Sequence, residues 1–191
     1  IDNYSHDDSC QMVSSEFPKV QLVQNKENLG FAKAVNMGVN ISRGHHICLL
    51  NPDSLIRGDT LFCLLTYLKQ NLDVGVVGCK ILNSDGTFQK ASRRKFPSFW
   101  VSFTHLLGLD RLFNFSSIFS KYHYSYINES KIHEVDAVSG ACMMFPKQVY
   151  LYLNGFDERY FLYFEDTDFC CRVKAIGKKV IYNPQTQIIH Y

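Results

Sequence analysis

Short apolar runs alternate with amphipathic stretches in the first half of the chain. The apolar runs predict strands at 20–25, 45–51 and 74–82. The stretches between them predict one helix over 30–44, which Gly44 closes, and another over 58–71, which Asp59 caps. Strand–helix–strand alternation is typical of an α/β fold with a mostly parallel central sheet flanked by helices.

The second half of the chain mixes strands and helices in a less regular order. Residues 135–145 predict a strand that Ser139-Gly140 interrupts, with a short helix after it. A longer helix is expected to end before Gly177. The last expected strands lie at 178–183 and 186–191. Because the two halves interleave, we predict a single domain over residues 1–191.

The composition is that of an ordinary globular protein. The chain has 191 residues, of which 46% are hydrophobic and 20% are charged, as expected for one domain with a substantial core. The net charge of +2 argues against a general nucleic-acid binder, because that class needs a strong basic field. The 7 cysteines lack zinc-site spacing, and those inside apolar runs predict core residues in a reducing, cytoplasmic compartment.

The most membrane-like stretch covers residues 96–119. Charged residues such as Asp110 and Arg111 interrupt it, so we do not expect a spanning helix. Arg93-Arg94-Lys95 precede it and several tyrosines follow, and basic residues beside aromatic ones are typical of a surface that rests on a bilayer. Two interpretations stay open, namely peripheral membrane contact and an irregular insertion that covers part of the core.

Asn51-Pro52-Asp53 come directly after a predicted buried strand. Proline ends the ladder of hydrogen bonds, and ligands of open α/β sheets bind beyond the carboxyl ends of strands. A carboxylate there suits Mg²⁺ or Mn²⁺, which take oxygen ligands and bridge to phosphates, and Asn51 would orient it. The alternative is a simple turn, because the same three residues are good turn formers.

Glu165-Asp166-Thr167-Asp168 place several carboxylates at the start of a predicted helix. One interpretation is N-capping, since free backbone N–H groups favour negative charge there. The other is a general base, because repulsion and burial raise the pKa of a carboxyl group towards a useful range. The aromatic residues around the cluster would supply the apolar wall.

Two further positions are candidates for ligand contact. His190 ends the last apolar strand, where a structural role competes with metal or phosphate binding. Asn28-Leu29-Gly30 form a loop that enters a predicted helix carrying Asn36. Such a loop suits phosphate or ribose contacts, although a helix-entry turn needs glycine in any case.

Seven short motifs, which include these candidate residues, follow one another along the chain. They are Asp2-Asn3-Tyr4-Ser5, Asn28 to Gly38, Leu50-Asn51-Pro52-Asp53, Ser139-Gly140-Ala141, Gly155-Phe156-Asp157-Glu158, Tyr163 to Asp168 with Arg172, and His190. Together they resemble the family 2 glycosyltransferases with the GT-A fold, and in particular the bacterial rhamnosyltransferase-like branch. The resemblance covers nearly the whole chain.

The resemblance implies a role for each position. Asp166 would be the general base, with Glu165 beside it on the acceptor side. Asp53 would hold the divalent metal, Mg²⁺ or Mn²⁺, and His190 would approach the metal or the diphosphate. Asp2 would accept a hydrogen bond from the pyrimidine N3–H. The nucleotide-sugar-binding set would be Asp2, Asn28, Gly30, Asn36, Asn51, Gly140 and Ala141.

The resemblance also implies the reaction. An acceptor hydroxyl would displace the nucleoside diphosphate from a donor such as dTDP-L-rhamnose or a UDP-sugar, with inversion at the anomeric carbon. The acceptor would be a glycan or a lipid-linked glycan. The protein would act in the cytoplasm, peripherally on the inner face of the plasma membrane.

One departure from the family pattern concerns the start of the chain. Family members begin with a strand and a helix that precede the residues seen here, so residues 1–191 are expected to be a fragment of the domain. An alternative function follows, namely an inactive fragment or pseudoenzyme that binds nucleotide or carbohydrate without transfer. A sugar nucleotidyltransferase is a weaker rival, because its glycine-rich basic triphosphate loop is not seen.

Overall fold

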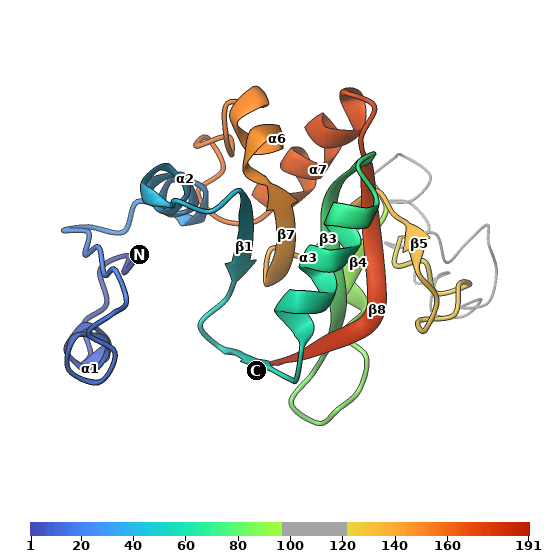
Figure 1. The fold of residues 1–191 in the computed structure, drawn as a ribbon. Helices are drawn as coiled ribbons and strands as arrows, with labels where there is room; N and C mark the ends of the chain where they lie inside the picture. The colour runs from blue at the N-terminus through green and yellow to red at the C-terminus, as the bar shows by residue number, and fades with distance from the viewer. Residues whose placement is uncertain (97–121) are drawn as a thin grey trace, which may run out of the picture.

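The computed structural model describes residues 1–96 and 122–191, and a mixed sheet lies at its centre (Figure 1). The strand order is β1-β7-β3-β8-β2, with β5 paired to β8. These strands are β1 (His46–Leu50), β2 (Ser54–Ile56), β3 (Val74–Leu82), β5 (His133–Glu134), β7 (Cys142–Pro146) and β8 (Lys179–His190). A separate short ladder joins β4 (Arg93–Arg94) to β6 (Ala137–Val138).

The pairing in the sheet is less parallel than the sequence predicted. β3 and β8 run parallel, as expected for strands joined by crossovers. However, β7 lies between β1 and β3 and is antiparallel to both, while β2 and β5 are antiparallel to β8. The expectation of a mostly parallel sheet is therefore wrong in detail, because β2, β5 and β7 each enter the sheet antiparallel to their neighbours.

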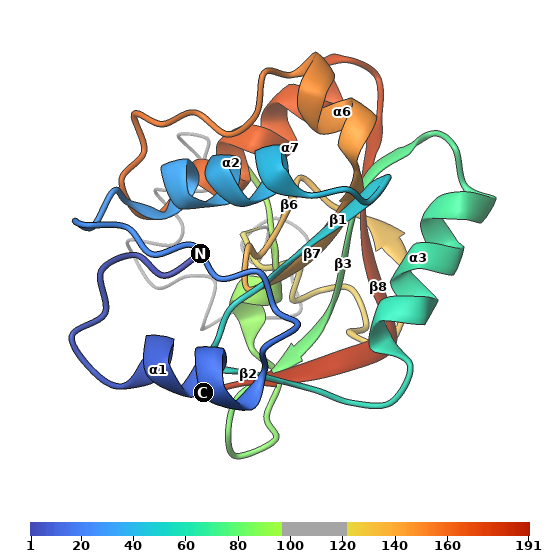
Figure 2. The same cartoon turned by 60° about the vertical axis from the view of Figure 1, so that its left-hand side comes forward.

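Helices cover both faces of the sheet. The helices are α1 (Ser9–Glu16), α2 (Phe31–Ile41), α3 (Thr60–Gln70), α6 (Lys147–Tyr152) and α7 (Glu165–Ala175), with a short 3₁₀ turn at Lys90–Ser92. α3 packs on one face through Leu64 and Leu68, whereas α2, α6 and α7 pack on the other (Figure 2). The two apolar clusters thus form the two halves of one core.

Several predicted boundaries are corrected by the structure. Residues 20–25 form no strand, only an isolated bridge from Gln24 to Asp2, because no neighbouring strand lies beside them in the described chain. α2 ends at Ile41, before Gly44, and Asp59 precedes α3 without a side-chain capping hydrogen bond. The expected last pair of strands is the single strand β8.

The predicted interruption by Ser139-Gly140 is confirmed, since β6 ends at Val138 and β7 begins at Cys142. Within residues 1–96 and 122–191, no helix combines the length and the hydropathy that crossing a membrane requires. Most of the apolar stretch at 96–119 lies outside the described residues.

Candidate active site

One group of candidate residues gathers where β1 and β8 end. The N–H of Asn51 donates to the carbonyl of Ala141 at 3.0 Å, and its side-chain Nδ2 lies 3.3 Å from Nε2 of His190. That Nε2 lies 3.2 Å from Oδ1 of Asp53. Pairing of β2 with β8 fixes this arrangement, because Tyr191 N–H donates to the Asp53 carbonyl at 3.0 Å.

Asp53 and His190 fit a divalent cation as partial ligands. The Asp53 side chain is 50% exposed, so its oxygens are open to a ligand. Nδ1 of His190 lies 3.3 Å from both Oε1 and Nε2 of Gln89. The donor Nδ2 of Asn51 lies 3.3 Å from Nε2 of His190, and the tautomer that accepts there keeps Nε2 as an electron-pair donor facing Asp53. No cluster of three or more His, Cys, Asp or Glu side chains that could hold a metal occurs among the described residues. Diphosphate oxygens and water would complete the coordination, as is usual for Mg²⁺.

A second group forms around Asp166, in the first turn of α7. Its Oδ2 accepts hydrogen bonds from the N–H of Gly140 at 2.9 Å and from Nη2 of Arg94 at 2.5 Å. Its Oδ1 accepts from the hydroxyl of Thr167 at 3.1 Å. Asp166 is 7% exposed, so this carboxylate is held in a largely desolvated setting.

The capping interpretation of the acidic cluster is not supported. The N-cap of α7 is Phe164, whose φ of 69° is left-handed, and no side chain caps the helix. Asp168 instead pairs with Arg172 one turn further along, at 2.7 Å. The three carboxylates therefore separate into different environments.

Glu165 is the most isolated of these carboxylates. It is 6% exposed, and its Oε2 has no hydrogen-bond partner in the described part of the chain. Burial raises the pKa of Glu165 above the ordinary glutamate value. The expected apolar wall is only partly present, because Phe169 is buried whereas Tyr163 and Phe164 are exposed.

A cavity of about 980 Å³ lies between the N-terminal segment, α2 and β1, and some residues of the expected nucleotide-sugar-binding set border it. Asp2, Asn28, Gly30 and Asn51 all line it. A hydrogen bond from Ser5 lowers the pKa of Asp2, which keeps this carboxyl group ionised as a hydrogen-bond acceptor.

Asn28 and Gly30 also hold the loop that precedes α2. Oδ1 of Asn28 accepts hydrogen bonds from Nδ2 of Asn3 at 2.7 Å and from the N–H of Gly30 at 3.0 Å. Gly30 has a φ of +83°, and a Cβ there would lie 2.6 Å from the carbonyl oxygen of Phe161. Only glycine fits this left-handed position against the loop before α7.

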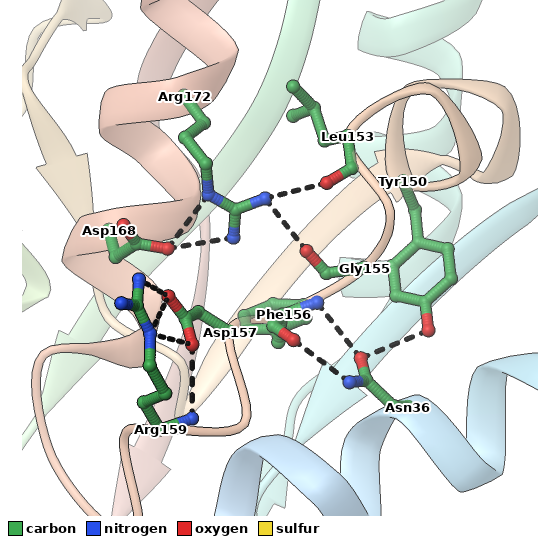
Figure 3. A network of polar contacts seen from close by, with 9 residues as sticks. All are labelled: Asn36, Tyr150, Leu153, Gly155, Phe156, Asp157, Arg159, Asp168 and Arg172. Atoms are coloured by element: carbon green, nitrogen blue, oxygen red, sulfur yellow. Dashed lines mark hydrogen bonds and ion pairs between the residues drawn. The ribbon is translucent and has the colours of Figure 1, made fainter.

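Asn36 is buried outside that cavity, in a polar network shown in Figure 3. Its Oδ1 accepts from the N–H of Phe156 at 2.9 Å and from the hydroxyl of Tyr150 at 3.0 Å. Its Nδ2 donates to the Phe156 carbonyl at 2.9 Å and to Glu158 at 3.0 Å. All four hydrogen-bonding positions of the amide are used, so Asn36 shapes the site only through the fold.

Gly140 and Ala141 join the two groups of residues. Ala141 is 4% exposed and accepts from Asn51, while Gly140 donates to Asp166. A Cβ added at Gly140 would lie 3.5 Å from the Cβ of Asp166, an ordinary contact. The backbone at this turn therefore links the Asp53 group to the Asp166 group.

Arg94 and Gln89 contact the candidate residues but were not predicted as part of the site. The sequence showed an arginine pair before an apolar stretch, which suggested membrane contact. That interpretation is wrong for Arg93, which is 2% exposed and lies between the rings of Phe88 and Tyr182. Successive residues of a strand point to opposite faces, so a buried Arg93 implies that Arg94 faces the other way. This inference was not available from the sequence, because β4 was not predicted. Peripheral membrane contact stays a prediction.

Two solved structures share the arrangement of strands and helices. GalNAc-T7 with UDP, GalNAc and Mn²⁺ matches with a TM-score of 0.68 at 12% identity, over 99% of this chain and 36% of that chain. Mannosyltransferase PcManGT from Pyrobaculum calidifontis, in complex with GDP-Man and Mn²⁺, matches with a TM-score of 0.65 at 19% identity, over 99% and 46%. The fold is therefore that of the GT-A glycosyltransferases.

Residues 3–191 match the family described as "Glycosyltransferase like family 2", and the chain belongs to that family. Rhamnosyltransferase WbbL of Escherichia coli K12 is 30% identical over 149 residues, which are 76% of this chain and 52% of the relative. The N-acetylglucosaminyl-diphospho-decaprenol L-rhamnosyltransferase of Mycobacterium tuberculosis is 26% identical over 100% of this chain and 64% of the relative. The chain thus spans less than two thirds of the length of these relatives.

Proposed function

We propose that the protein is an inverting glycosyltransferase that moves a sugar from a nucleoside-diphosphate donor to a glycan or lipid-linked glycan. The observation that carries this proposal is the continuous set of contacts from Asp53 through His190 and Asn51 to the Gly140-Ala141 turn and Asp166. These contacts connect the carboxylate proposed to bind the cation, Asp53, to the buried carboxylate proposed as the base, Asp166.

The names of two relatives support the choice of substrates. Both are rhamnosyltransferases, which favours dTDP-L-rhamnose as the donor over a UDP-sugar. The mycobacterial name specifies a diphospho-decaprenol acceptor, which favours a lipid-linked acceptor. Such an acceptor would require the protein to act peripherally at the cytoplasmic face of a membrane.

The residues would act together in one displacement. Asp2 accepts a hydrogen bond from the pyrimidine base, and the Gly140-Ala141 turn leaves room for the donor sugar. The acceptor hydroxyl attacks the anomeric carbon from the face opposite the diphosphate, and Asp166 takes the hydroxyl proton as the new bond forms. The bond to the diphosphate breaks, and the anomeric configuration inverts.

A divalent cation would be held by Asp53 and His190, where it would stabilise the negative charge of the leaving diphosphate. Both structural neighbours are complexes with Mn²⁺, which supports this assignment. Glu165, buried beside Asp166, would face the acceptor side.

The test is an assay of nucleoside-diphosphate release from the donor in the presence of acceptor. Asp166→Asn should lower the rate by about 10² to 10⁴-fold, the contribution typical of a general base, while nucleotide binding stays intact. Asp73→Asn is the matched control, because Asp73 forms a surface ion pair with Lys179.

Three outcomes separate the candidate functions. Loss of release with retained binding in Asp166→Asn supports the transferase. Nucleotide binding by the unsubstituted chain without any release would instead favour a non-catalytic binding domain. Equal rates for Asp166→Asn and the unsubstituted chain would remove Asp166 as the base.

A further inference from the structure

The shortest of the hydrogen bonds described above for Asp166 comes from Arg94, which lies outside α7. Arg94 lies on β4, and β4 pairs with β6 so that Arg94 stands opposite Ala137, just before the Gly140 turn. Its Nη2 reaches Oδ2 of Asp166 at 2.5 Å, and the two side chains are only 18% and 10% exposed. The pair is thus a buried, charge-assisted hydrogen bond between residues far apart in the sequence.

The two carboxylate oxygens of Asp166 differ in how many lone pairs are left to accept a further hydrogen bond. Oδ2 accepts from both Arg94 and the Gly140 N–H, which fills its two lone pairs. Among the described residues, Oδ1 accepts only from the rotatable hydroxyl of Thr167. One lone pair of Oδ1 therefore stays available for an incoming hydroxyl.

A structural role alone explains this pair poorly. Burying two charges is expensive, and a buried ion pair stabilises a fold no better than well-packed apolar residues of similar volume. Asp166 also has a backbone donor and a hydroxyl donor without Arg94. Arg94 adds a second hydrogen-bond donor to Oδ2. This donor is directional and carries a positive charge, opposite to that of the carboxylate.

We propose that Arg94 is the positioning residue of the base: by saturating Oδ2 it orients the carboxylate of Asp166, so that Oδ1 takes the proton of the acceptor hydroxyl. This inference rests on the proposed transferase function. On this proposal Arg94 acts on the reaction through Asp166, while a second hydrogen bond, from Nη2 to the Val138 carbonyl at 3.4 Å, holds its guanidinium against β6. Within residues 1–96 and 122–191 the neighbouring Glu165 has no such partner on Oε2, which is why we assign the oriented carboxylate to Asp166 and not to Glu165.

The experiment measures kcat and the donor KM for Arg94→Gln and Arg94→Lys. A misplacement of the base by about 1 Å can reduce the rate about 10²-fold, so Arg94→Gln should lower kcat by about that factor with an unchanged donor KM. Arg94→Lys keeps the charge but replaces the planar guanidinium, whose Nη2 donates both to Oδ2 of Asp166 and to the Val138 carbonyl, and should give an intermediate kcat.

Arg159→Gln is the matched control. Arg159 forms an ion pair with Asp157 at 2.6 Å, and its side chain is 89% exposed. Its replacement should leave kcat unchanged. Thermal melting of every variant verifies that it is folded at the assay temperature.

A double variant keeps the proposal falsifiable even if Arg94→Gln is less stable. Because Arg94 acts through Asp166, adding Arg94→Gln to Asp166→Asn should cause no further loss of the residual rate. Additive losses, or an Arg94→Gln effect confined to KM or to melting, would overturn the positioning role. Full activity of Asp166→Asn, or no release by the unsubstituted chain, would instead overturn the proposed function and with it the role of Arg94.

Discussion

Asp166 and Asp53, in the two groups of the candidate site, differ in how much of their surroundings the protein itself supplies. Asp166 is 7% exposed and receives hydrogen bonds from three elements, namely β4, the Gly140 turn and α7. The Asp53 side chain is 50% exposed, and the His190 imidazole lies 3.2 Å from its Oδ1. The Asp166 group is thus assembled before any ligand arrives, whereas the Asp53 group is open.

This difference fits the roles proposed for the two groups. A base must be aimed before the acceptor binds, and preorganised donors achieve this without rearrangement during the reaction. A cation that arrives with a diphosphate needs open coordination positions, and an exposed carboxylate–imidazole contact contributes little stability by itself. Substitutions in the first group should therefore change rate or stability, and substitutions in the second should change ligand binding.

Arg93 gives the largest expected effect, on stability. Its guanidinium lies 5.3 Å and 5.1 Å from the ring centroids of Phe88 and Tyr182 and donates to the Ile127 carbonyl at 2.7 Å. Arg93→Gln should lower the free energy of unfolding by about 3 kcal/mol, through lost cation–π contacts and a lost buried hydrogen bond. Chemical denaturation measures this loss.

Because Arg93 anchors β4 and not the Asp53 group, nucleotide affinity of the folded Arg93→Gln variant should stay as in the unsubstituted chain. Weaker nucleotide binding at unchanged stability would contradict the separation of the two groups. Arg159→Gln again serves as the control, since an exposed pair is expected to change stability by less than about 1 kcal/mol.

Asp53 gives the next effect, on ligand-induced stabilisation. A nucleotide at about 100 times its dissociation constant should add about 2.7 kcal/mol to the unsubstituted chain in the presence of Mn²⁺ or Mg²⁺. Asp53→Ala should lose most of this metal-dependent gain while its own melting temperature without ligand is unchanged. Thermal unfolding with dTDP or UDP, with and without metal, makes the measurement. An undiminished gain would remove Asp53 as a cation ligand.

Glu165 gives the smallest effect, and it depends on pH. Burial raises its pKa, so the folded state binds this proton more tightly than the unfolded chain does. The free energy of unfolding therefore falls as pH rises from the ordinary glutamate pKa through the raised folded value. Glu165→Gln removes this loss of stability. The difference in melting temperature, variant minus unsubstituted chain, should therefore increase as the pH is raised from about 4 to about 8, by no more than about 4 °C.

A pH-independent difference between the Glu165→Gln variant and the unsubstituted chain would contradict the burial of an ionisable group there. The same titration of Asp73→Asn provides the control, because Asp73 lies at the surface in an ion pair with Lys179. Hydrogen bonding to Lys179 lowers the pKa of Asp73, so its pH dependence should have the opposite sign.

Local patterns in the sequence predicted the local features of this fold. The leucine spacing of α3, the break at Ser139-Gly140 and the turn after β1 all depend on residues close together in the chain. α1 was not foreseen, because none of its residues is buried and no apolar stripe marks it. The insertion of β7 between β1 and β3 also has no local signal, since it depends on pairing between distant strands.

The candidate site shows the same contrast between local features, which the sequence predicted, and long-range contacts, which it did not. Asp53 and Asp166 were predicted from their positions at a strand end and a helix start. In the structure Asp166 accepts from the Gly140 N–H, whereas Asp53 contacts His190 and is connected to the Gly140-Ala141 turn only through His190 and Asn51 in the described chain. Arg94 could not be predicted, because its contact with Asp166 spans 72 residues and depends on the β4–β6 ladder. The hydrogen bonds that occupy the Asn36 amide could not be predicted either, since its partners lie more than 100 residues away in the sequence.

The most direct test of the account is the anomeric configuration of the transferred sugar. The unsubstituted chain is incubated with dTDP-L-rhamnose, a lipid-linked acceptor and Mn²⁺, and the product is examined by NMR. The account predicts a product whose anomeric configuration is opposite to that of the donor, and no product with Asp166→Asn. A product with retained configuration, or one formed equally well by Asp166→Asn, would contradict a single displacement with Asp166 as the base.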